Sequence, residues 1–309
     1  MKILFLCSGS SGVSPIVTAQ AESLSKAFVE VEIVSISGKG FVGYIRSVPV
    51  LNMQISLHNP DVVHAHYSLC GIVAAIASSR PIITSLMGSD VKSSSFWRVV
   101  IRFFIRYIWD ATIVKSEDMR RSLGVNSDKV HIIPNGVDLD IFRPLDKSEC
   151  RKKLGWNDSI RVILFAANPD RHEKNFKLAK ESFMKADLHD AELKVVYKVK
   201  HEDIPYYLCA SDVLISTSKW EGSPNIIKEA MACNIPIVST DVGDVSSLAD
   251  GIDSIWICEE NPHKIAKAVI GALEYAGNIC SRNKLRDIGL DSLSTAQRIT
   301  TLYNETIAR

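Results

Sequence analysis

The sequence predicts an α/β fold in which two doubly wound, Rossmann-like domains face each other across a cleft. Short apolar runs alternate with segments of helical spacing along the chain, which is the rhythm of parallel strands joined by crossover helices. This rhythm pauses once, where Pro134, Asn135 and Gly136 begin a stretch of turn residues. The length of 309 residues also suits two domains of roughly 150 residues each.

The apolar runs and the periodic segments locate the expected elements. Runs too short for helices predict buried parallel strands at 3–7, 31–36, 61–65, 81–86, 111–114 and 130–133, and then at 161–166, 193–199, 213–216, 236–239 and 255–258. Helical spacing predicts helices at 16–28, 97–107, 176–186, 224–233, 263–275 and 291–308. Because ligands of such sheets bind beyond the carboxyl ends of the strands, the loops that follow strands should carry the chemistry.

Composition excludes several classes of protein. Hydrophobic residues make up 46% and charged residues 23%, the balance of an ordinary globular protein. The net charge is only +1, which argues against nucleic acid as a partner. The seven cysteines are odd in number, widely spaced and without a C-x-x-C pair, so neither a disulfide framework nor a zinc site is expected.

The first apolar run ends at the Gly/Ser-rich stretch from Ser8 to Gly12, which is too early for a secretory signal peptide. No run approaches the ~18 apolar residues of a membrane span. We therefore expect a cytoplasmic protein, either free or peripheral at the inner face of the membrane.

The segment from Trp220 to Ala232 predicts an anion site. Ser223 suits an N-cap and Pro224 the first helical position, so a helix should begin here. The backbone amides of its first turn, at Ser223, Asn225 and Ile226, suit a diphosphate. Gly222 would let a ligand approach the backbone closely.

Two carboxylates accompany this helix. Glu221 precedes it and can reach a sugar at its mouth, whereas Glu229 lies inside it and can accept hydrogen bonds from both hydroxyls of a ribose. On the residues alone, a solvated pair of glutamates around an ordinary capped helix is the favoured interpretation.

Glu221 and Glu229 have the E-x7-E spacing of family 4 retaining glycosyltransferases, which have the GT-B fold, and the segment from Glu221 to Val245 resembles that family's donor-binding region. Three other stretches resemble family motifs in the same order along the chain: Asp61–His66 (DVVHAH), Gly88–Asp90 (GSD) and Pro134–Asp138 (PNGVD) with Phe142 and Pro144. Bacterial enzymes of capsule, teichuronic-acid and lipopolysaccharide assembly show the strongest resemblance.

The resemblance implies domain bounds and site roles. It places the last helix back on the first domain, which gives domains of 1–145 with 293–309 and of 146–292. It implies that Glu221 contacts the donor sugar, that Glu229 binds the ribose and that Lys174 neutralises the diphosphate. The family's second cation does not match, because Pro169 occupies its position, and either Arg171 replaces it or Lys174 acts alone.

On the first domain the resemblance places the active-site histidine at His66, near the sugar and the attacking hydroxyl, and a phosphate-approaching glycine at Gly12. Asp90 of the GSD turn is a candidate on the acceptor side. His64 should be buried deeper and structural.

The segment 91–109 contains Arg98, Arg102 and Arg106 at helical spacing, several aromatic residues and no acidic residue. A basic aromatic helix suits an anionic membrane surface and a lipid-linked acceptor, so Arg98 and Arg102 are acceptor-side candidates. The favoured interpretation is instead a helix that packs its aromatic side chains on the sheet and keeps its arginines in water.

The resulting hypothesis is a retaining hexosyltransferase that moves a sugar from a nucleotide-sugar, with UDP the expected nucleotide, to a glycan or lipid-linked glycan acceptor in bacterial surface polysaccharide synthesis. No cofactor and no metal are expected, because no D-x-D motif lies in a suitable loop. Two alternatives stay open: a nucleotide-sugar epimerase of GT-B fold, and a non-catalytic nucleotide-sugar binding protein.

Overall fold

Two parallel β-sheets organise the residues that this computed structural model describes, which are 1–9, 12–36, 40–91 and 94–309. The first unit comprises Met1–Gly136 and Ser292–Arg309, and the second Val137–Asp291. Ser10 and Ser11 of the first loop, and Lys92 of the basic segment, lie outside the described residues.

The sheet of the first unit has six strands in the order β2-β1-β3-β4-β5-β6, and every pairing is parallel. Its strands are β1 (Lys2–Ser8), β2 (Glu30–Ile36), β3 (Val62–His66), β4 (Ile82–Ser85), β5 (Ala111–Val114) and β6 (Val130–Ile132). The order reverses between β1 and β3, which makes the carboxyl ends of these two strands the topological switch point of the sheet.

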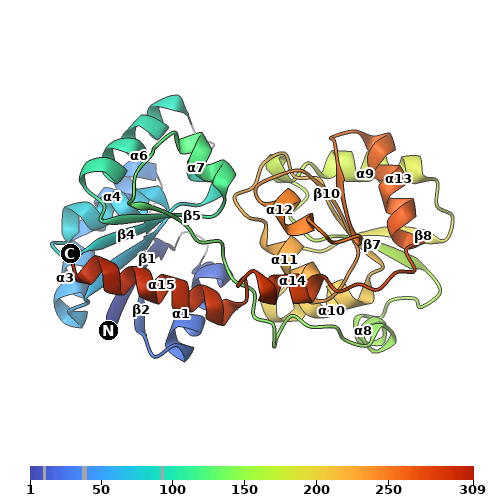
Figure 1. Ribbon diagram of the computed structural model, residues 1–309, viewed down its shortest axis with the longest axis horizontal. Helices are drawn as coiled ribbons and strands as arrows, with labels where there is room; N and C mark the ends of the chain where they lie inside the picture. The colour runs from blue at the N-terminus through green and yellow to red at the C-terminus, as the bar shows by residue number, and fades with distance from the viewer. Residues whose placement is uncertain (10–11, 37–39, 92–93) are drawn as a thin grey trace. The chain divides into compact units, whose positions relative to one another are not determined.

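Helices cover both faces of this sheet. Leu4 and Leu6 of β1 face one hydrophobic cluster, whereas Ile3 and Phe5 face another that includes α1 and α15, which lie side by side in Figure 1. The helices are α1 (Pro15–Lys26), α2 (Gly40–Ile45), α3 (Val48–His58), α4 (Ser68–Ala77), α5 (Gly88–Val91), α6 (Ser95–Tyr107), α7 (Glu117–Leu123) and α15 (Ser292–Ile307).

The sheet of the second unit has five strands in the order β11-β10-β9-β7-β8, again all parallel. Its strands are β7 (Arg161–Phe165), β8 (Ala191–Val195), β9 (Val213–Ser216), β10 (Ile237–Thr240) and β11 (Ile255–Cys258). The switch point here lies between β7 and β9.

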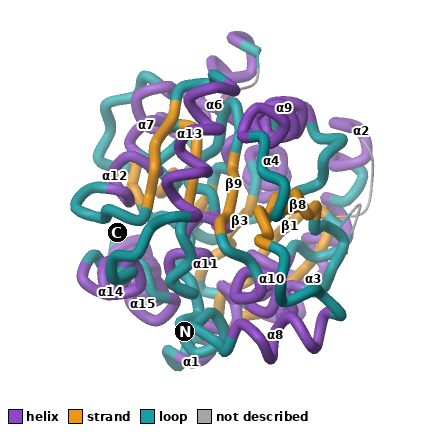
Figure 2. The backbone as a smooth tube through the Cα atoms, turned by 90° about the vertical axis from the view of Figure 1, so that its right-hand side faces the viewer, coloured by secondary structure: helices purple, strands orange, loops and turns teal. Residues whose placement is uncertain are grey.

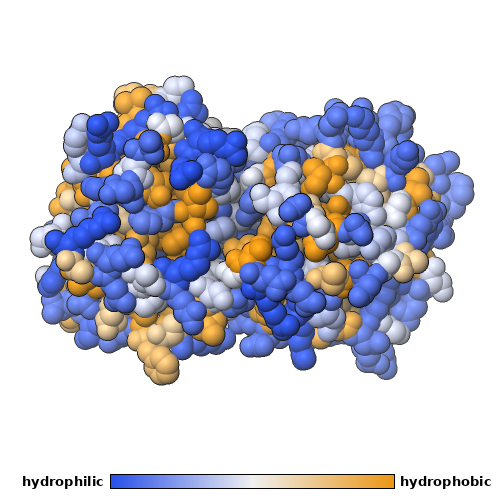
Figure 3. Space-filling view, in the orientation of Figure 1, coloured by the Kyte–Doolittle hydropathy of each residue, from blue (hydrophilic) through white to orange (hydrophobic). Residues whose placement is uncertain are grey.

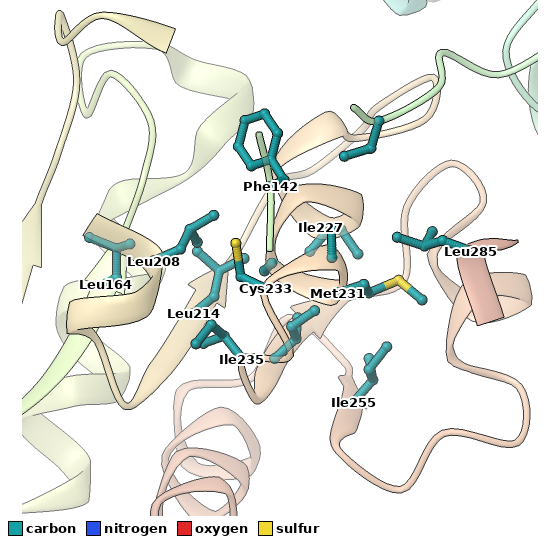
Figure 4. Close-up of a cluster of buried hydrophobic side chains, with 14 of the residues drawn as sticks. Phe142, Leu164, Leu208, Leu214, Ile227, Met231, Cys233, Ile235, Ile255 and Leu285 are labelled. Atoms are coloured by element: carbon teal, nitrogen blue, oxygen red, sulfur yellow. The ribbon is translucent and has the colours of Figure 1, made fainter. Parts of the chain in front are cut away.

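This sheet is also covered on both faces. Leu164 and Leu214 point into a cluster with α11, shown in Figure 4, whereas Ile163, Phe165 and Val213 point toward α9 and α13. The helical elements are α8 (Lys147–Leu154), η1 (His172–Lys174), α9 (Phe176–Ala186), η2 (His201–Asp203), α10 (Ile204–Ala210), α11 (Asn225–Ala232), α12 (Val245–Ala249), α13 (Pro262–Leu273) and α14 (Ser281–Asp287). Figure 2 shows the same helices and strands from the side.

The predicted pair of doubly wound parallel α/β domains is thus confirmed. The compact units divide after Gly136, earlier than the predicted boundary at residue 145. The reason is that the PNGVD stretch already packs on the second unit: the Val137 amide donates to Leu290 O at 2.9 Å, and Phe142 is buried in the α11 cluster (Figure 4).

Most predicted strands are found within one or two residues of their expected bounds. The exception is β8, which begins at Ala191 and ends at Val195 rather than running from 193 to 199. Ala191 already pairs with Arg161, and the chain turns at Lys198, whose φ is 59°.

None of the helices in the described ranges is long and apolar enough to cross a bilayer. The surface of each unit mixes hydrophilic with hydrophobic residues (Figure 3).

Candidate functional site

Lys174 and Glu221 meet at the switch point of the second sheet. Lys174 ends η1 in the loop after β7, and Glu221 lies in the loop after β9, so the two adjacent strands bring both residues to one edge. Lys174 Nζ lies 2.5 Å from Glu221 Oε1, and each side chain is 18% exposed. The sequence predicted both residues for the donor site, and the structure places a cation and a carboxylate in direct contact there.

Hydroxyl groups at the end of β9 hold this pair in place. Ser218 Oγ donates to the same Glu221 oxygen at 2.9 Å, and Thr217 Oγ1 donates to the carbonyl oxygens of Lys174 and Asn175. The polar residues 216–218 at the end of a buried strand could have indicated this role, but the sequence interpretation did not use them.

Ser223 is not the N-cap of α11, which corrects the sequence prediction. Helix α11 begins at Asn225 with Pro224 as its flanking residue, and Ser223 Oγ donates to Asp244 Oδ2 at 2.7 Å instead. Asp244 follows Gly243, whose φ of +63° and close approach to the carbonyl of Gly222 leave no room for a side chain. The group that closely approaches the backbone of Gly222 is therefore Gly243, in the loop after β10.

A buried charge lies beneath this loop. Lys228 of α11 is fully buried, and burial lowers its pKa to about 8, an effect that the nearby carboxylates of Asp244 and Glu229 oppose. Burial raises the pKa of Asp244, and the Lys228 charge opposes that rise. Lys228 thus stays protonated at neutral pH and adds positive potential under the first turn of α11.

The first turn of α11 contains Asn225 and Ile226, both half-buried. The Ile226 side chain packs against the α11 cluster, so only its backbone amide is available to a phosphate.

Arg171 is paired within its own loop. Its Nε donates to Glu173 Oε1 at 2.6 Å, and 58% of its side chain is exposed. Lys219 Nζ lies 3.0 Å from His172 Nε2 in the same region, and the Lys219 amide donates to Glu173 O. Lys174 is therefore the cation that directly contacts the carboxylate at the switch point.

Glu229 contacts a residue that the sequence did not predict. His201 Nε2 lies 2.8 Å from Glu229 Oε1, and Glu229 is 7% exposed. The hydrogen bond to Glu229 raises the pKa of His201, and burial opposes this rise. His201 follows β8 with no periodic pattern that would have marked it.

In the first unit, His66 ends β3 at the switch point beside β1. Its ring stacks on His64 with a centroid distance of 4.5 Å and contacts Phe5 edge-on. The ring is 2% exposed, and neither ring nitrogen hydrogen-bonds to a residue in the described part of the chain. Burial and then the Lys115 charge lower the pKa of His66 to about 3, so the imidazole is neutral at physiological pH.

His64 is hydrogen-bonded on both sides. Its Nδ1 lies 2.5 Å from the Tyr303 hydroxyl of α15, and its Nε2 lies 2.8 Å from Ser85 Oγ. The two histidines of the DVVHAH stretch therefore differ: His64 joins β3 and β4 to α15, whereas both ring nitrogens of His66 are buried without a hydrogen-bond partner among the described residues.

Gly12 lies in the loop after β1, and Asp90 lies on α5, the short helix that follows β4. Gly12 has a φ of +85° and open space where a Cβ would lie. Asp90 is 1% exposed and accepts hydrogen bonds from the Met87 amide and from the amide and hydroxyl of Ser68. Burial nevertheless raises the pKa of Asp90 to about 7. Asp90 thus connects Ser68, at the start of α4, to Met87, in the loop after β4, and is buried from solvent.

Helix α6 is only partly explained by packing on the sheet. Ile101, Ile105 and the following Trp109 are buried, but Phe96 is 74%, Phe103 53% and Tyr107 65% exposed. These three share one face because they are seven and four residues apart. Arg106 lies beside that face, with its guanidinium 5.9 Å from the centroid of the Tyr107 ring, whereas Arg98 donates to Ser95 Oγ and Arg102 Nε donates to the carbonyl of Leu123.

Comparison with known proteins shows which family these motifs belong to. The protein-family model described as "Glycosyltransferase Family 4" matches residues 9–141 of this chain. A second family model, described as "Glycosyl transferases group 1", matches residues 152–275. The chain belongs to the family 4 glycosyltransferases. The expected resemblance is thereby confirmed, and Lys174, Glu221 and Glu229 lie within the second match.

Two relatives of this family 4 chain come from bacterial polysaccharide synthesis. The putative teichuronic acid biosynthesis glycosyltransferase TuaC of Bacillus subtilis is 27% identical over an alignment of 238 residues, and the match covers 68% of this chain and 60% of TuaC. A UDP-Gal:α-D-GlcNAc-diphosphoundecaprenol α-1,3-galactosyltransferase of Escherichia coli is 25% identical over an alignment of 289 residues, and the match covers 79% of this chain and 75% of that protein. The chain thus matches little more than half the length of TuaC.

Among solved structures, Anabaena Alr3699/HepE in complex with UDP superimposes with a TM-score of 0.77 at 17% identity, covering 99% of this chain and 100% of that one. The family 4 chain therefore has the GT-B type of fold.

Proposed function

We propose that this protein transfers a sugar from a nucleotide-sugar to a glycan or lipid-linked glycan in bacterial surface polysaccharide synthesis. The Lys174–Glu221 contact at the switch point carries this proposal, because it places a cation for a diphosphate beside an acceptor for sugar hydroxyls. The family matches and the polysaccharide relatives support the same activity.

In this proposal the second unit binds the donor. Lys174 Nζ moves from Glu221 to the diphosphate, and Glu221 then accepts hydrogen bonds from the donor sugar. The amides at Ser223, Asn225 and Ile226, with Lys228 beneath them, add positive potential. UDP is the expected nucleotide, because HepE binds UDP and the E. coli relative is named for UDP-Gal.

We propose a retaining reaction without a metal. The bond from the anomeric carbon to the diphosphate breaks, and the acceptor oxygen attacks that carbon from the same face. The acceptor proton passes to the departing phosphate oxygen, while Lys174 stabilises the charge that develops there. An α-linked product from an α-linked donor, and turnover that is unchanged by EDTA, are the expected results.

The first unit would then bind the acceptor. His66 can donate from one ring nitrogen and accept at the other, because its imidazole is neutral and both nitrogens are unpartnered among the described residues. A lipid-linked acceptor would explain the aromatic face of α6, and the arginines of the same helix suit anionic headgroups. This would make the protein peripheral at the inner membrane face.

Nucleotide binding tests the donor site first. UDP, GDP and ADP are titrated against the wild type, Lys174→Ala and Lys177→Ala, and thermal unfolding is recorded. Lys177 is the matched control, because it is exposed and pairs with Glu181 on α9. A nucleotide at 100 times its Kd should stabilise the fold by about 2.7 kcal/mol in the wild type and the control, with most of the shift lost in Lys174→Ala. Equal shifts in all three proteins would refute the assignment of Lys174.

A further inference from the structure

The carboxylate of Glu229 is held by the side chain of His201, which has no role in the proposed reaction. Glu229 lies on α11 and is 7% exposed, and His201 Nε2 approaches its Oε1 to 2.8 Å. The two residues come from different elements, since His201 begins η2 in the segment that follows β8. The contact therefore joins α11 to the segment that follows the edge strand β8.

The imidazole of His201 is itself fixed in position. Its ring lies 5.2 Å from the ring of Phe142, centroid to centroid, with the planes tilted by 53°. Phe142 is 2% exposed and packs into the α11 cluster shown in Figure 4. The His201 carbonyl accepts a hydrogen bond from the Ile204 amide, which ties η2 to the start of α10. Ring and backbone are thus both constrained.

A buried carboxylate needs such a partner. Without it the Glu229 carboxylate would be buried with no hydrogen bond to fix its orientation, and burial of an unpaired charge is unfavourable. The other groups acting electrostatically on Glu229 are Lys228, which is adjacent on α11, and Cys233. His201 is the residue whose hydrogen bond to the carboxylate fixes the orientation of one particular oxygen.

We infer that His201 is a positioning residue that fixes Glu229 through Oε1 and directs Oε2 at the 2′-hydroxyl of the donor ribose, so that the protein selects ribonucleotide over 2′-deoxyribonucleotide donors. This inference rests on the proposed donor site. A ribose hydroxyl that donates to a fixed carboxylate is bound more tightly than one that must first order it. Uridine, guanosine and adenosine diphosphate sugars are accepted, and deoxythymidine diphosphate sugars are disfavoured.

Isothermal titration calorimetry at pH 7 tests the inference. UDP, GDP and ADP, each with its 2′-deoxy form, are titrated into the wild type, His201→Ala, His201→Gln and the control His189→Ala. His189 is exposed in the same unit, before β8. The wild type and control should prefer the best ribonucleotide over its 2′-deoxy form by about 10- to 100-fold, the effect of one hydrogen bond to a charged group.

His201→Ala should bring this preference below about 3-fold, with 2′-deoxy binding unchanged. Unchanged 2′-deoxy binding also shows that this variant is folded. His201→Gln keeps an N–H donor and should restore most of the preference, which a merely structural role would not predict.

A wild-type preference for the ribonucleotide in both His201 variants would overturn the inference without affecting the proposed donor site. Equal binding of the ribonucleotide and its 2′-deoxy form by the wild type would have the same meaning. Absence of binding by the wild type to all six nucleotides would overturn the proposed function, and the inference with it.

Discussion

At the scale of single residues, the site depends on pairs whose members come from loops far apart in sequence. Lys174 and Glu221 are 47 positions apart, and His201 and Glu229 are 28 apart. Each pair combines a carboxylate with a nitrogen donor in a place that is mostly covered. Such pairs hold their geometry before a ligand arrives, and a transferase needs this because donors aimed at developing charge must already be in place.

Glu221→Gln should therefore lower the rate of sugar transfer by about 10²- to 10³-fold, because the carboxylate that contacts Lys174 and accepts from the donor sugar is lost. Steady-state transfer from the preferred nucleotide-sugar measures the effect. Glu181→Gln on α9 is the matched control and should leave the rate within about twofold. A rate for Glu221→Gln close to that of the control would remove Glu221 from the reaction.

Stability should depend on pH through His66. Its pKa is about 3 in the folded protein against an ordinary value of 6.5, so between these pH values the unfolded chain binds a proton that the folded chain does not. Stability therefore falls as pH drops through this window, by about 1.4 kcal/mol per pH unit for one histidine.

Urea unfolding at pH 4, 5 and 6 measures this slope. The pKa of Asp90 is about 7 in the folded protein against an ordinary value of 3.8, so between these pH values Asp90 makes the stability fall as the pH rises, opposite to His66. The slope of each variant is therefore compared with the slope of the wild type. His66→Gln should show a slope about 1.4 kcal/mol per pH unit lower than that of the wild type. His58→Gln, at the end of α3, is the control and should match the wild-type slope.

At the scale of elements, α14 and α6 each present side chains whose positions are not explained by packing in the hydrophobic core. On α14, Arg282 donates to the carbonyl oxygens of Leu139, Phe142 and Ala232. It thereby fastens the PNGVD stretch to the end of α11. Helix α6 instead leaves an aromatic stripe in solvent.

Replacing Arg282 by alanine should destabilise the second unit by about 1–3 kcal/mol, because three carbonyl groups lose their donor in a partly buried place. Arg286→Ala, one turn further along the same helix and exposed, should cost less than about 0.5 kcal/mol. Chemical unfolding of both variants, followed by fluorescence, gives the two values. Equal values would mean that solvent replaces the contacts of Arg282 without loss.

Sedimentation with vesicles tests the stripe on α6. Vesicles with anionic lipid should bind the wild type, and the double change Arg98→Glu with Arg106→Glu should reduce binding about tenfold or more, since each cation near such a surface contributes about 1 kcal/mol. Phe103→Ser should weaken binding to neutral and anionic vesicles alike. Lys180→Glu with Lys185→Glu on α9 controls for net charge. Identical binding by the two double variants would exclude α6 as the contact.

At the scale of the whole molecule, the two units have separate cores, so a ligand of one should protect that unit alone. Hydrogen exchange with and without the preferred nucleotide should slow in 166–175, 199–203 and 217–232, which contain Lys174, His201 and Glu221. Peptides from 48–58 on α3 should be unaffected. Protection centred on the first unit would place the nucleotide elsewhere.

The sequence was sufficient to predict the strand pattern, because buried parallel strands are continuous apolar runs that leave little ambiguity. Lys174 and Glu221 lie in loops after strands and His66 at the carboxyl end of a strand, as predicted. The sequence interpretation missed His201, because a histidine between polar loop residues has no periodicity and its partner lies on another element. It assigned Ser223 as a helix cap for a similar reason: only the fold shows that Asp244, from the loop after β10, competes for that hydroxyl.

The return of α15 to the first unit has a consequence for biosynthesis. Ile299, Leu302 and Tyr303 cover Phe5 and Val62, residues made almost 300 and 240 positions earlier. While the ribosome is still translating, the part of this sheet face that α15 will cover is exposed, and His64 lacks the hydroxyl of Tyr303. The second unit, whose residues are contiguous, can fold as it emerges. The first half to be synthesised is thus the last to be finished, and its nascent form is a natural client for chaperones that bind exposed hydrophobic surface.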